Sequence, residues 1–439
     1  MTKRIEPLAR LGLVFLILAL VFAPGEGTAQ PGAHRPDDLT IVPDGLVDVR
    51  QLPPPAVGGP TTRAIPRHFP DLELLLQHKQ GLERGGPGAP PAPEPEAVVP
   101  PTSTPPGTGP STIGLKQSES GGWYPPDTQI AAGPDHLFEA VNIKGRILTK
   151  NMAKAVDDFD LNPFFGLSNS VFTSDPKVRY DPLSGRWFAL LITVQNPAGA
   201  WKLAVSTSSD PTGTFCRYTI SSKRGTFPDF PALGISADKV VLTANAFSLS
   251  GVFQGTEFVV LRKSQLLTCS TTSGQFFGPP RGLFTIQPAH SLSSINTLHM
   301  AAVAFNSASS IRLWSVNGVP GVGTGVTFTT VNRTIPTLST PPDARQPGTT
   351  ALIETNDNRL LDAVFRDGVL WVSANSACTP SGDSAVRSCL RFMQILTAGL
   401  TVNQTLDVGD VGIYFYYPAI QTDGSNNLIA VFSGSSGSQ

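Results

Sequence analysis

Four aspartates are the first candidates for chemistry in this chain, because each stands where a short strand is expected to begin. They are Asp127, Asp175, Asp229 and Asp362. If these strand starts converge, the carboxylates could hold a calcium ion, bind the hydroxyls of a sugar, or supply the acid and the base for glycoside hydrolysis. The alternative is structural: each aspartate accepts backbone N–H bonds in its own turn.

Aromatic side chains are the second candidate, since their rings are natural stacking surfaces for a carbohydrate. Most of the tyrosines and tryptophans fall inside apolar strands, where packing between sheets explains them. Trp123 and Tyr124 instead precede a strand start, and so do Tyr416 and Tyr417 in the cluster Tyr414–Tyr417. We expect these residues to lie in loops and to form an exposed ligand surface.

Standard catalytic signatures do not occur in the sequence. It has no Gly-x-Ser-x-Gly elbow, no His-Glu-x-x-His pair and no phosphate-binding glycine-rich loop next to a helix. The formal net charge is -1 and charged residues make up 15% of the chain. Without a basic patch, a nucleic-acid partner is not expected.

The elements that must position these residues are repeated strands. An Asp/Pro start, an alternating strand, a turn and a more apolar strand recur about every 50 to 70 residues. The copies begin at Pro126, Ser174, Asp229, near His299, at Leu361 and at Tyr417. This pattern is typical of a β-propeller, so we predict an all-β fold with six blades, with five or seven as alternatives.

The sixth blade has room for only two strands before the Ser/Gly-rich residues 433–439. Either residues near Ile113 to Leu115 complete this blade or the sequence is truncated, because an open ring would leave exposed sheet edges.

The first 29 residues predict a signal peptide. They combine Lys3 and Arg4, an apolar run over residues 11–23 and the small-residue site Gly27-Thr28-Ala29. The apolar run is shorter than the roughly 20 residues that cross a bilayer, so we expect cleavage and a secreted or cell-envelope location without a membrane span.

Residues 30–112 are rich in Pro, Gly and Ala, a composition that predicts a disordered, semi-rigid tether. One island, residues 70–78, could form two or three helical turns with Asp71 near the start. It is either a marginal isolated helix or a peptide that binds a partner. Residues 113–439 form the predicted propeller domain.

Four cysteines, Cys216, Cys269, Cys378 and Cys389, favour disulfides in an exported protein. Three connectivities are open. The short spacing of Cys378 and Cys389 suits a local bridge between successive strands, and Cys216 with Cys269 would then join neighbouring blades. Zinc is not expected, since no Cys-x-x-Cys pair occurs.

The amino-acid sequence of the repeats resembles that of a group of exported bacterial β-propeller proteins, which are loosely assigned to the sialidase-like superfamily. The resemblance covers about residues 122–436. The motifs that carry it are Pro125-Pro-Asp-Thr128, Asp175-Pro176 with Tyr180-Asp-Pro182, Asp229-Phe-Pro231 and Leu360-Leu-Asp-Ala-Val364. It implies a fold more than an activity.

The turn Asp181–Trp187 is similar to the Asp-box turn of sialidases, but its spacing departs from that motif. The Phe/Tyr-Arg-Ile-Pro motif with which sialidases begin is absent. The most similar stretch, Arg333–Pro336, lies late in the chain and contains one extra residue relative to the motif. Sialidase activity is therefore not carried over to any residue.

The sequence thus predicts a secreted, monomeric β-propeller that binds glycan or an extracellular protein without catalysis. The alternative is a glycoside hydrolase or related carbohydrate-active enzyme that uses the axial aspartates. A scaffold with no small ligand is the third reading. No cofactor is expected other than calcium.

Overall fold

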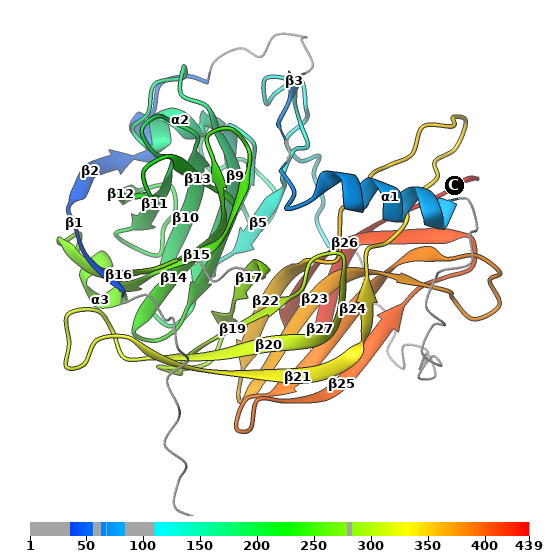
Figure 1. The fold of residues 1–439 in the computed structure, drawn as a ribbon. Coiled ribbons are helices and arrows are strands. Elements are labelled where there is room, and N and C mark those ends of the chain that lie inside the picture. The colour runs from blue at the N-terminus through cyan, green and yellow to red at the C-terminus, as the bar shows by residue number, and fades with distance from the viewer. Residues whose placement is uncertain (1–35, 56–62, 67, 84–108, 279–282, 439) are drawn as a thin grey trace, which may run out of the picture. The chain divides into compact units, whose positions relative to one another are not determined.

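The computed structural model describes residues 36–55, 63–66, 68–83, 109–278 and 283–438 (Figure 1). The predicted signal peptide lies outside these residues. The described chain from Pro36 onward belongs to one compact unit. Strands make up most of its regular structure, which confirms the all-β class. No helix within the described ranges has both the length and the apolar character to cross a membrane.

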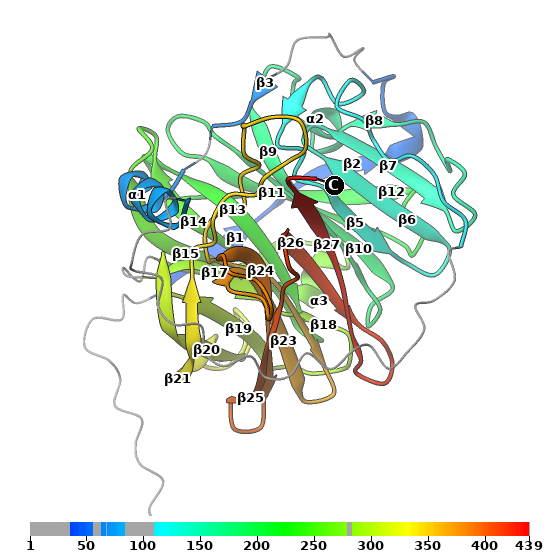
Figure 2. The same cartoon turned by 90° about the vertical axis from the view of Figure 1, so that its right-hand side faces the viewer.

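Antiparallel sheets follow one another along the chain, and we number them as repeats 1 to 6 (Figures 1 and 2). Repeat 1 contains β5 (Gln129–Ala132), β6 (His136–Val141), β7 (Lys144–Thr149) and β8 (Phe159–Asp160). Repeat 2 contains β9 (Thr173–Asp181), β10 (Arg186–Thr193), β11 (Ala200–Ser206) and β12 (Thr214–Ser221). Repeat 3 contains β13 (Thr226–Ile235), β14 (Lys239–Ser248), β15 (Phe253–Arg262) and β16 (Thr272–Phe277).

The second half of the chain continues this order. Repeat 4 contains β17 (Phe284–Pro288), β19 (Leu298–Val303), β20 (Ser307–Asn317) and β21 (Thr327–Ser339). Repeat 5 contains β22 (Leu360–Arg366), β23 (Val369–Cys378), β24 (Arg387–Leu396) and β25 (Thr401–Val408). Repeat 6 contains β26 (Ile413–Thr422) and β27 (Leu428–Ser436). The short strand β18 (His290–Ser291) pairs in parallel with β13 and β22 and so links repeats 3 and 5.

The predicted start of the fourth repeat near His299 is wrong by one strand. His299 lies in β19, the second strand of repeat 4, and the first strand is β17. That strand has the sequence Phe-Thr-Ile-Gln-Pro and is buried along its whole length. It lacks the Asp/Pro start that marks the other copies, and its polar residues Thr285 and Gln287 are buried.

The range predicted as a disordered tether contains ordered elements. Strands β1 (Asp37–Ile41) and β2 (Pro43–Asp48) pair with β16 and β12, where they become fifth strands of repeats 3 and 2. The 3-10 turn η1 (Val49–Gln51) follows. Ile41 and Val49 are buried, 7% and 4% exposed. The averaged Pro/Gly composition hides these apolar residues, and the outer edges of two sheets supply the backbone partners that they need.

A strap of residues 63–66 and 68–83 continues this ordered part. It contains β3 (Arg63–Ala64), which pairs with β4 (Trp123–Tyr124), and helix α1 (Leu72–Glu83). The helix was predicted around Asp71, and the Asp71 carboxylate accepts the Leu74 N–H at 2.9 Å as an N-terminal cap. It is not isolated, because Leu75 and Lys79 are buried against the rest of the chain.

The residues expected to complete repeat 6 lie elsewhere. The Ile113 carbonyl accepts a hydrogen bond from Arg146, and the Leu115 N–H donates to Glu139. Both contacts are with repeat 1. Repeat 6 accordingly has two hydrogen-bonded strands in the described part of the chain.

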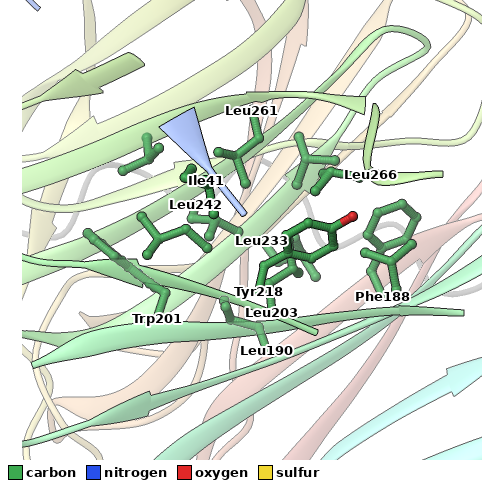
Figure 3. Packing of buried hydrophobic residues seen from close by; sticks show 14 of the residues in the cluster. Ile41, Phe188, Leu190, Trp201, Leu203, Tyr218, Leu233, Leu242, Leu261 and Leu266 are labelled. Carbon is green, nitrogen blue, oxygen red and sulfur yellow. The ribbon is translucent and has the colours of Figure 1, made fainter. Parts of the chain in front are cut away.

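Apolar side chains between neighbouring sheets form the core. Figure 3 shows the cluster between repeats 2 and 3, where Trp201, Leu203 and Tyr218 face Leu233 and Leu242. Strand β10 is buried along almost its entire length, as expected for a strand covered on both faces. The short helices α2 (Leu161–Phe164) and α3 (Lys263–Leu266) pack at sheet ends.

The predicted disulfides are confirmed. Cys378 pairs with Cys389 across strands β23 and β24, and Cys216 in repeat 2 pairs with Cys269 in repeat 3.

Candidate functional site

The first strands of the repeats share an irregularity where the candidate aspartates lie. In repeats 2 to 6 the pairing of the first strand with the second is interrupted by a bulge. In four of these bulges one residue has positive φ: Asp175 (56°), Phe230 (49°), Thr285 (61°) and Tyr417 (56°). Asp127 (47°), just before β5 of repeat 1, has positive φ as well. Such a backbone costs a non-glycine residue roughly 1–2 kcal/mol, so its neighbours must hold it.

Side chains from the preceding repeat supply that stabilisation. Asn142 directly follows the second strand β6, whereas Asn245 and Asn375 lie in the second strands β14 and β23. The Oδ1 atoms of these asparagines accept the N–H groups of Asp175, Thr285 and Tyr417, in that order, at 3.0, 2.8 and 2.8 Å. Phe230 donates instead to the Asp175 carboxylate at 3.0 Å. The bulges are therefore tied together from one repeat to the next.

The four predicted aspartates do not occupy equivalent positions. Asp127 and Asp175 both have positive φ, but Asp127 precedes β5 whereas Asp175 lies in the bulge of β9. Asp229 precedes it by one residue and pairs with Asn245, whereas Asp362 follows the bulge of its strand and pairs with Ser373. A bulge adds a residue that the sequence pattern does not reveal, so counting from the nearest proline misaligns the repeats.

Asp127, Asp175 and Asp229 nevertheless form one group, which we call the axial acid cluster. The Asn142 side chain connects two of them, since its Nδ2 donates to Asp127 at 2.6 Å while its Oδ1 accepts from Asp175. Burial, followed by repulsion from the Asp127 and Asp229 carboxylates, raises the pKa of Asp175 well above its ordinary value. Burial likewise raises the pKa of Asp127, and a hydrogen bond to Asp175 links the two carboxyl groups.

Asp362 belongs to a different arrangement. Its Oδ1 is 2.7 Å from the Arg179 guanidinium and its Oδ2 accepts the Ile420 N–H at 3.1 Å. The prediction that each aspartate serves its own turn is thus incomplete, because Asp175 and Asp362 both accept N–H groups from the following repeat.

Two basic residues beside the cluster come from the same strand as Asp175. Lys177 and Arg179 follow it at alternate positions of β9, and all three side chains are half-buried while Pro176 and Val178 between them are buried. Sequence analysis missed both residues, although the two-residue period of a strand places them on the face of Asp175.

The strap reaches the same region. His68 Nδ1 lies 3.5 Å from Asp229 Oδ1, and Phe69 lies 5.7 Å from the Arg359 guanidinium. Arg359 is held by Asp357 through contacts of 2.7–3.1 Å, with the rings of Phe230 and Phe284 each 4.5 Å away. No sequence pattern pointed to this arrangement, because its parts come from three distant segments.

The strap is also anchored at its helix. The Lys79 ammonium is paired with Asp343 and lies 3.4 Å from the Thr355 hydroxyl, and its side chain is 4% exposed.

The aromatic residues predicted to form a ligand surface have different environments. Tyr416 is buried and Tyr417 is 39% exposed, and both lie within β26 instead of in a loop before it. Tyr417 also donates to the Glu354 carbonyl at 3.0 Å. Trp123 packs edge-on against Phe172, and Tyr124 is 48% exposed. Each pair thus presents one ring to solvent.

The described residues contain no group of three or more His, Cys, Asp or Glu side chains arranged to hold a metal ion. A pocket of about 330 Å³ lies between loops of repeats 4 and 5, and none of the predicted site residues lines it. Its lining is Ile295, Thr297, His299, Ser315, Asn317, Gly368, Thr397 and Ala398.

Comparison with known proteins identifies no family. No family model matches the chain, and no curated protein is significantly similar to it. The resemblance to the sialidase-like superfamily is therefore not confirmed. Among solved structures, an apocarotenoid oxygenase variant from Synechocystis matches with a TM-score of 0.40 and 12% identity, over 70% of this chain. This chain spans 65% of the length of that oxygenase chain.

Two further matches are glycoside-acting proteins by name. The arabinanase of Bacillus subtilis matches with a TM-score of 0.28 and 13% identity, over 61% of this chain and 93% of its own. An exo-β-1,3-galactanase from Phanerochaete chrysosporium matches with a TM-score of 0.32 and 11% identity, over 69% and 73%. Scores this low do not establish a shared fold, so the proposals below are based on the residues of this chain.

Proposed function

We propose that this protein is a carbohydrate-active enzyme that hydrolyses a glycosidic bond at the axial acid cluster. The observation that carries the proposal is the grouping of carboxyl groups: the Asn142 side chain joins Asp127 to Asp175, and burial with the Asp127 and Asp229 carboxylates raises the pKa of Asp175. Glycoside hydrolysis needs this combination, a protonated acid for the leaving oxygen and an ionised carboxylate as base or nucleophile.

The roles follow from the surroundings of each group. Asp175 is the general acid, because burial and the Asp127 and Asp229 carboxylates favour its protonated form. Asp229 is the proposed base or nucleophile, and its Oδ1 lies 3.5 Å from His68 Nδ1. Asp127 is a positioning residue, since it contacts Asp175 and is held by Asn142 at 2.6 Å.

The proposal also includes the predicted propeller fold, the ligand surface and the extracellular location. A closed six-bladed propeller would bring the first strands, and hence the cluster, to its axis. The exposed rings of Tyr124 and Tyr417 are the proposed stacking surfaces for the glycan. Two disulfides are compatible with an extracellular location. Secretion, the monomeric state and a calcium ion stay predictions.

The test is a hydrolysis assay on the full chain with a panel of plant and bacterial polysaccharides, detected as new reducing ends. Asp175→Asn and Asp229→Asn should each lower the rate by about 100-fold or more, the usual effect of losing a general acid or base. Asp135→Asn, at an exposed turn, is the matched control and should retain activity. A parallel series with EGTA tests the calcium ion.

The non-enzymatic reading predicts a different result. If a glycan binds to the wild type without turnover, and binding is lost in Tyr417→Ala, the protein is a binding module and the enzyme proposal is wrong. If no polysaccharide is bound or cut, and the aspartate variants only melt earlier, the cluster is structural.

A further inference from the structure

Lys177 is half-buried and, within the described residues, differs from the buried lysines in making no ion pair with a carboxylate. Elsewhere each such ammonium pairs with a carboxylate: Lys79 with Asp343, Lys144 with Asp160, Lys202 with Asp44, Lys239 with Asp238 and Lys263 with Asp181. Within the described residues Lys177 has neither a hydrogen bond nor an ion pair of this kind, and its Nζ lies 5.2 Å from the centre of the Phe230 ring.

The charges around Lys177 come from three repeats. Asp175 and Arg179 flank it on β9, Asp127 approaches from repeat 1 and Asp362 from repeat 5. Arg179 is already committed to Asp362 at 2.7 Å, and the Asp175 carboxylate accepts the Phe230 N–H. Burial lowers the pKa of Lys177, and Arg179 acts in the same direction against the attraction of the carboxylates.

We propose that Lys177 is a nucleophilic amine that forms an imine with the aldehyde group of a small ligand, with Asp175 as the proton donor. An amine that lacks an ion-pair partner and lies next to a second cation is the arrangement that activates lysine for this chemistry. The ligand class is an aldehyde, such as the open-chain form of a reducing sugar. The proposal goes beyond glycoside hydrolysis, since it requires no glycosidic bond.

The step balances without a redox partner. The neutral Lys177 nitrogen attacks the carbonyl carbon, a C–N bond forms, and the carbonyl oxygen takes up the proton that the nitrogen loses, which gives a carbinolamine. The Asp175 carboxyl then donates its proton to the hydroxyl, which leaves as water while the nitrogen lone pair forms the C=N bond. The product is a protonated imine next to the Asp175 carboxylate.

The experiment labels the full chain with glycolaldehyde in the presence of cyanoborohydride, which reduces an imine to a stable secondary amine, and maps the adducts by peptide mass spectrometry. Lys150 is the reference because it is exposed, and Lys239 is the control for a buried, paired lysine. Access alone predicts slower labelling at half-buried Lys177 than at Lys150. We expect it to be several-fold faster, because burial and the nearby Arg179 charge lower the pKa of Lys177 and so raise its neutral fraction.

Two further conditions distinguish specific activation of Lys177 from non-specific labelling. Unfolding in urea with the disulfides intact should abolish the preference for Lys177, and Asp175→Asn should slow labelling at Lys177 at least several-fold while Lys150 is unchanged. Labelling of Lys177 no faster than Lys150 in the folded chain overturns the proposal, as does a preference that persists in urea. This result is independent of hydrolysis, so the two proposals can fail separately.

Discussion

The Phe230 amide donates a 3.0 Å hydrogen bond to the Asp175 carboxylate, which belongs to the preceding repeat. One oxygen of a candidate catalytic residue thus fixes the backbone of its neighbour, at a residue with positive φ. Because the bond needs only an acceptor, Asn at position 175 preserves it, and a charge-neutral variant can test chemistry with little loss of structure.

The asparagines that hold the other bulges should matter for stability. Asn245→Ala removes the acceptor for the Thr285 N–H and also the donor to the Thr285 hydroxyl, both buried. We expect it to lower the free energy of unfolding by about 1–3 kcal/mol in urea titrations. Asn403→Ala, at an exposed side-chain contact with Gln394, should change it by less than about 0.5 kcal/mol. Equal losses in the two variants would contradict this role.

Glu257 should make stability depend on pH. Burial raises its pKa from 4.5 to about 7, although the Ser222 hydroxyl donates to it. The folded state therefore retains a proton that the unfolded state releases, so this contribution to stability falls as the pH rises from about 4.5 to about 7. Glu257→Gln should remove that fall, worth about 3 kcal/mol, and be more stable than the wild type at pH 8. Urea midpoints across this range are the measurement, and parallel curves for the two proteins would refute the assignment.

The two disulfides should contribute unequally. The bridge Cys216–Cys269 closes a loop with a sequence separation of 53, against 11 for Cys378–Cys389. Loop-closure entropy gives about 4 and about 3 kcal/mol, so the double Cys→Ala variant of the first pair should be the less stable. Denaturant unfolding of both variants ranks them, and the reverse order would show that strain or residual unfolded structure decides.

The strap should be released by loss of its anchor. Lys79→Ala removes the partner of Asp343 and should raise hydrogen exchange in residues 72–83 without similar changes in β10 or β14. Lys150→Ala, on an exposed turn, is the control and should leave exchange in the helix unchanged. Unchanged exchange in Lys79→Ala would mean that Leu75 and the rest of the helix hold it.

The strand repeats were predictable where the alternation of polar and apolar side chains indicates the two faces of a sheet. The β9–β10 pair was recognised from Ser174 to Ile192 because alternating and apolar strands flank a Pro/Gly turn. The pattern failed at β17, which is buried throughout, and at β1 and β2, whose strand character depends on edges far along the chain. The candidate site was partly predicted: three aspartates lie close together, but Asn142 and Arg359 contact Asp175 and Phe230 from distant segments, which no local spacing encodes.

The strap precedes the first repeat in sequence, but Lys79 and its partner Asp343 are 264 residues apart. Asp229 and Arg359 are likewise synthesised long after His68 and Phe69. During translation the strap therefore cannot dock until repeats 3 to 5 have emerged from the ribosome. The contacts of the strap would then form last, although its residues are made early. Contacts between such distant segments favour slow folding, and Asp229 lacks its His68 neighbour in every earlier intermediate.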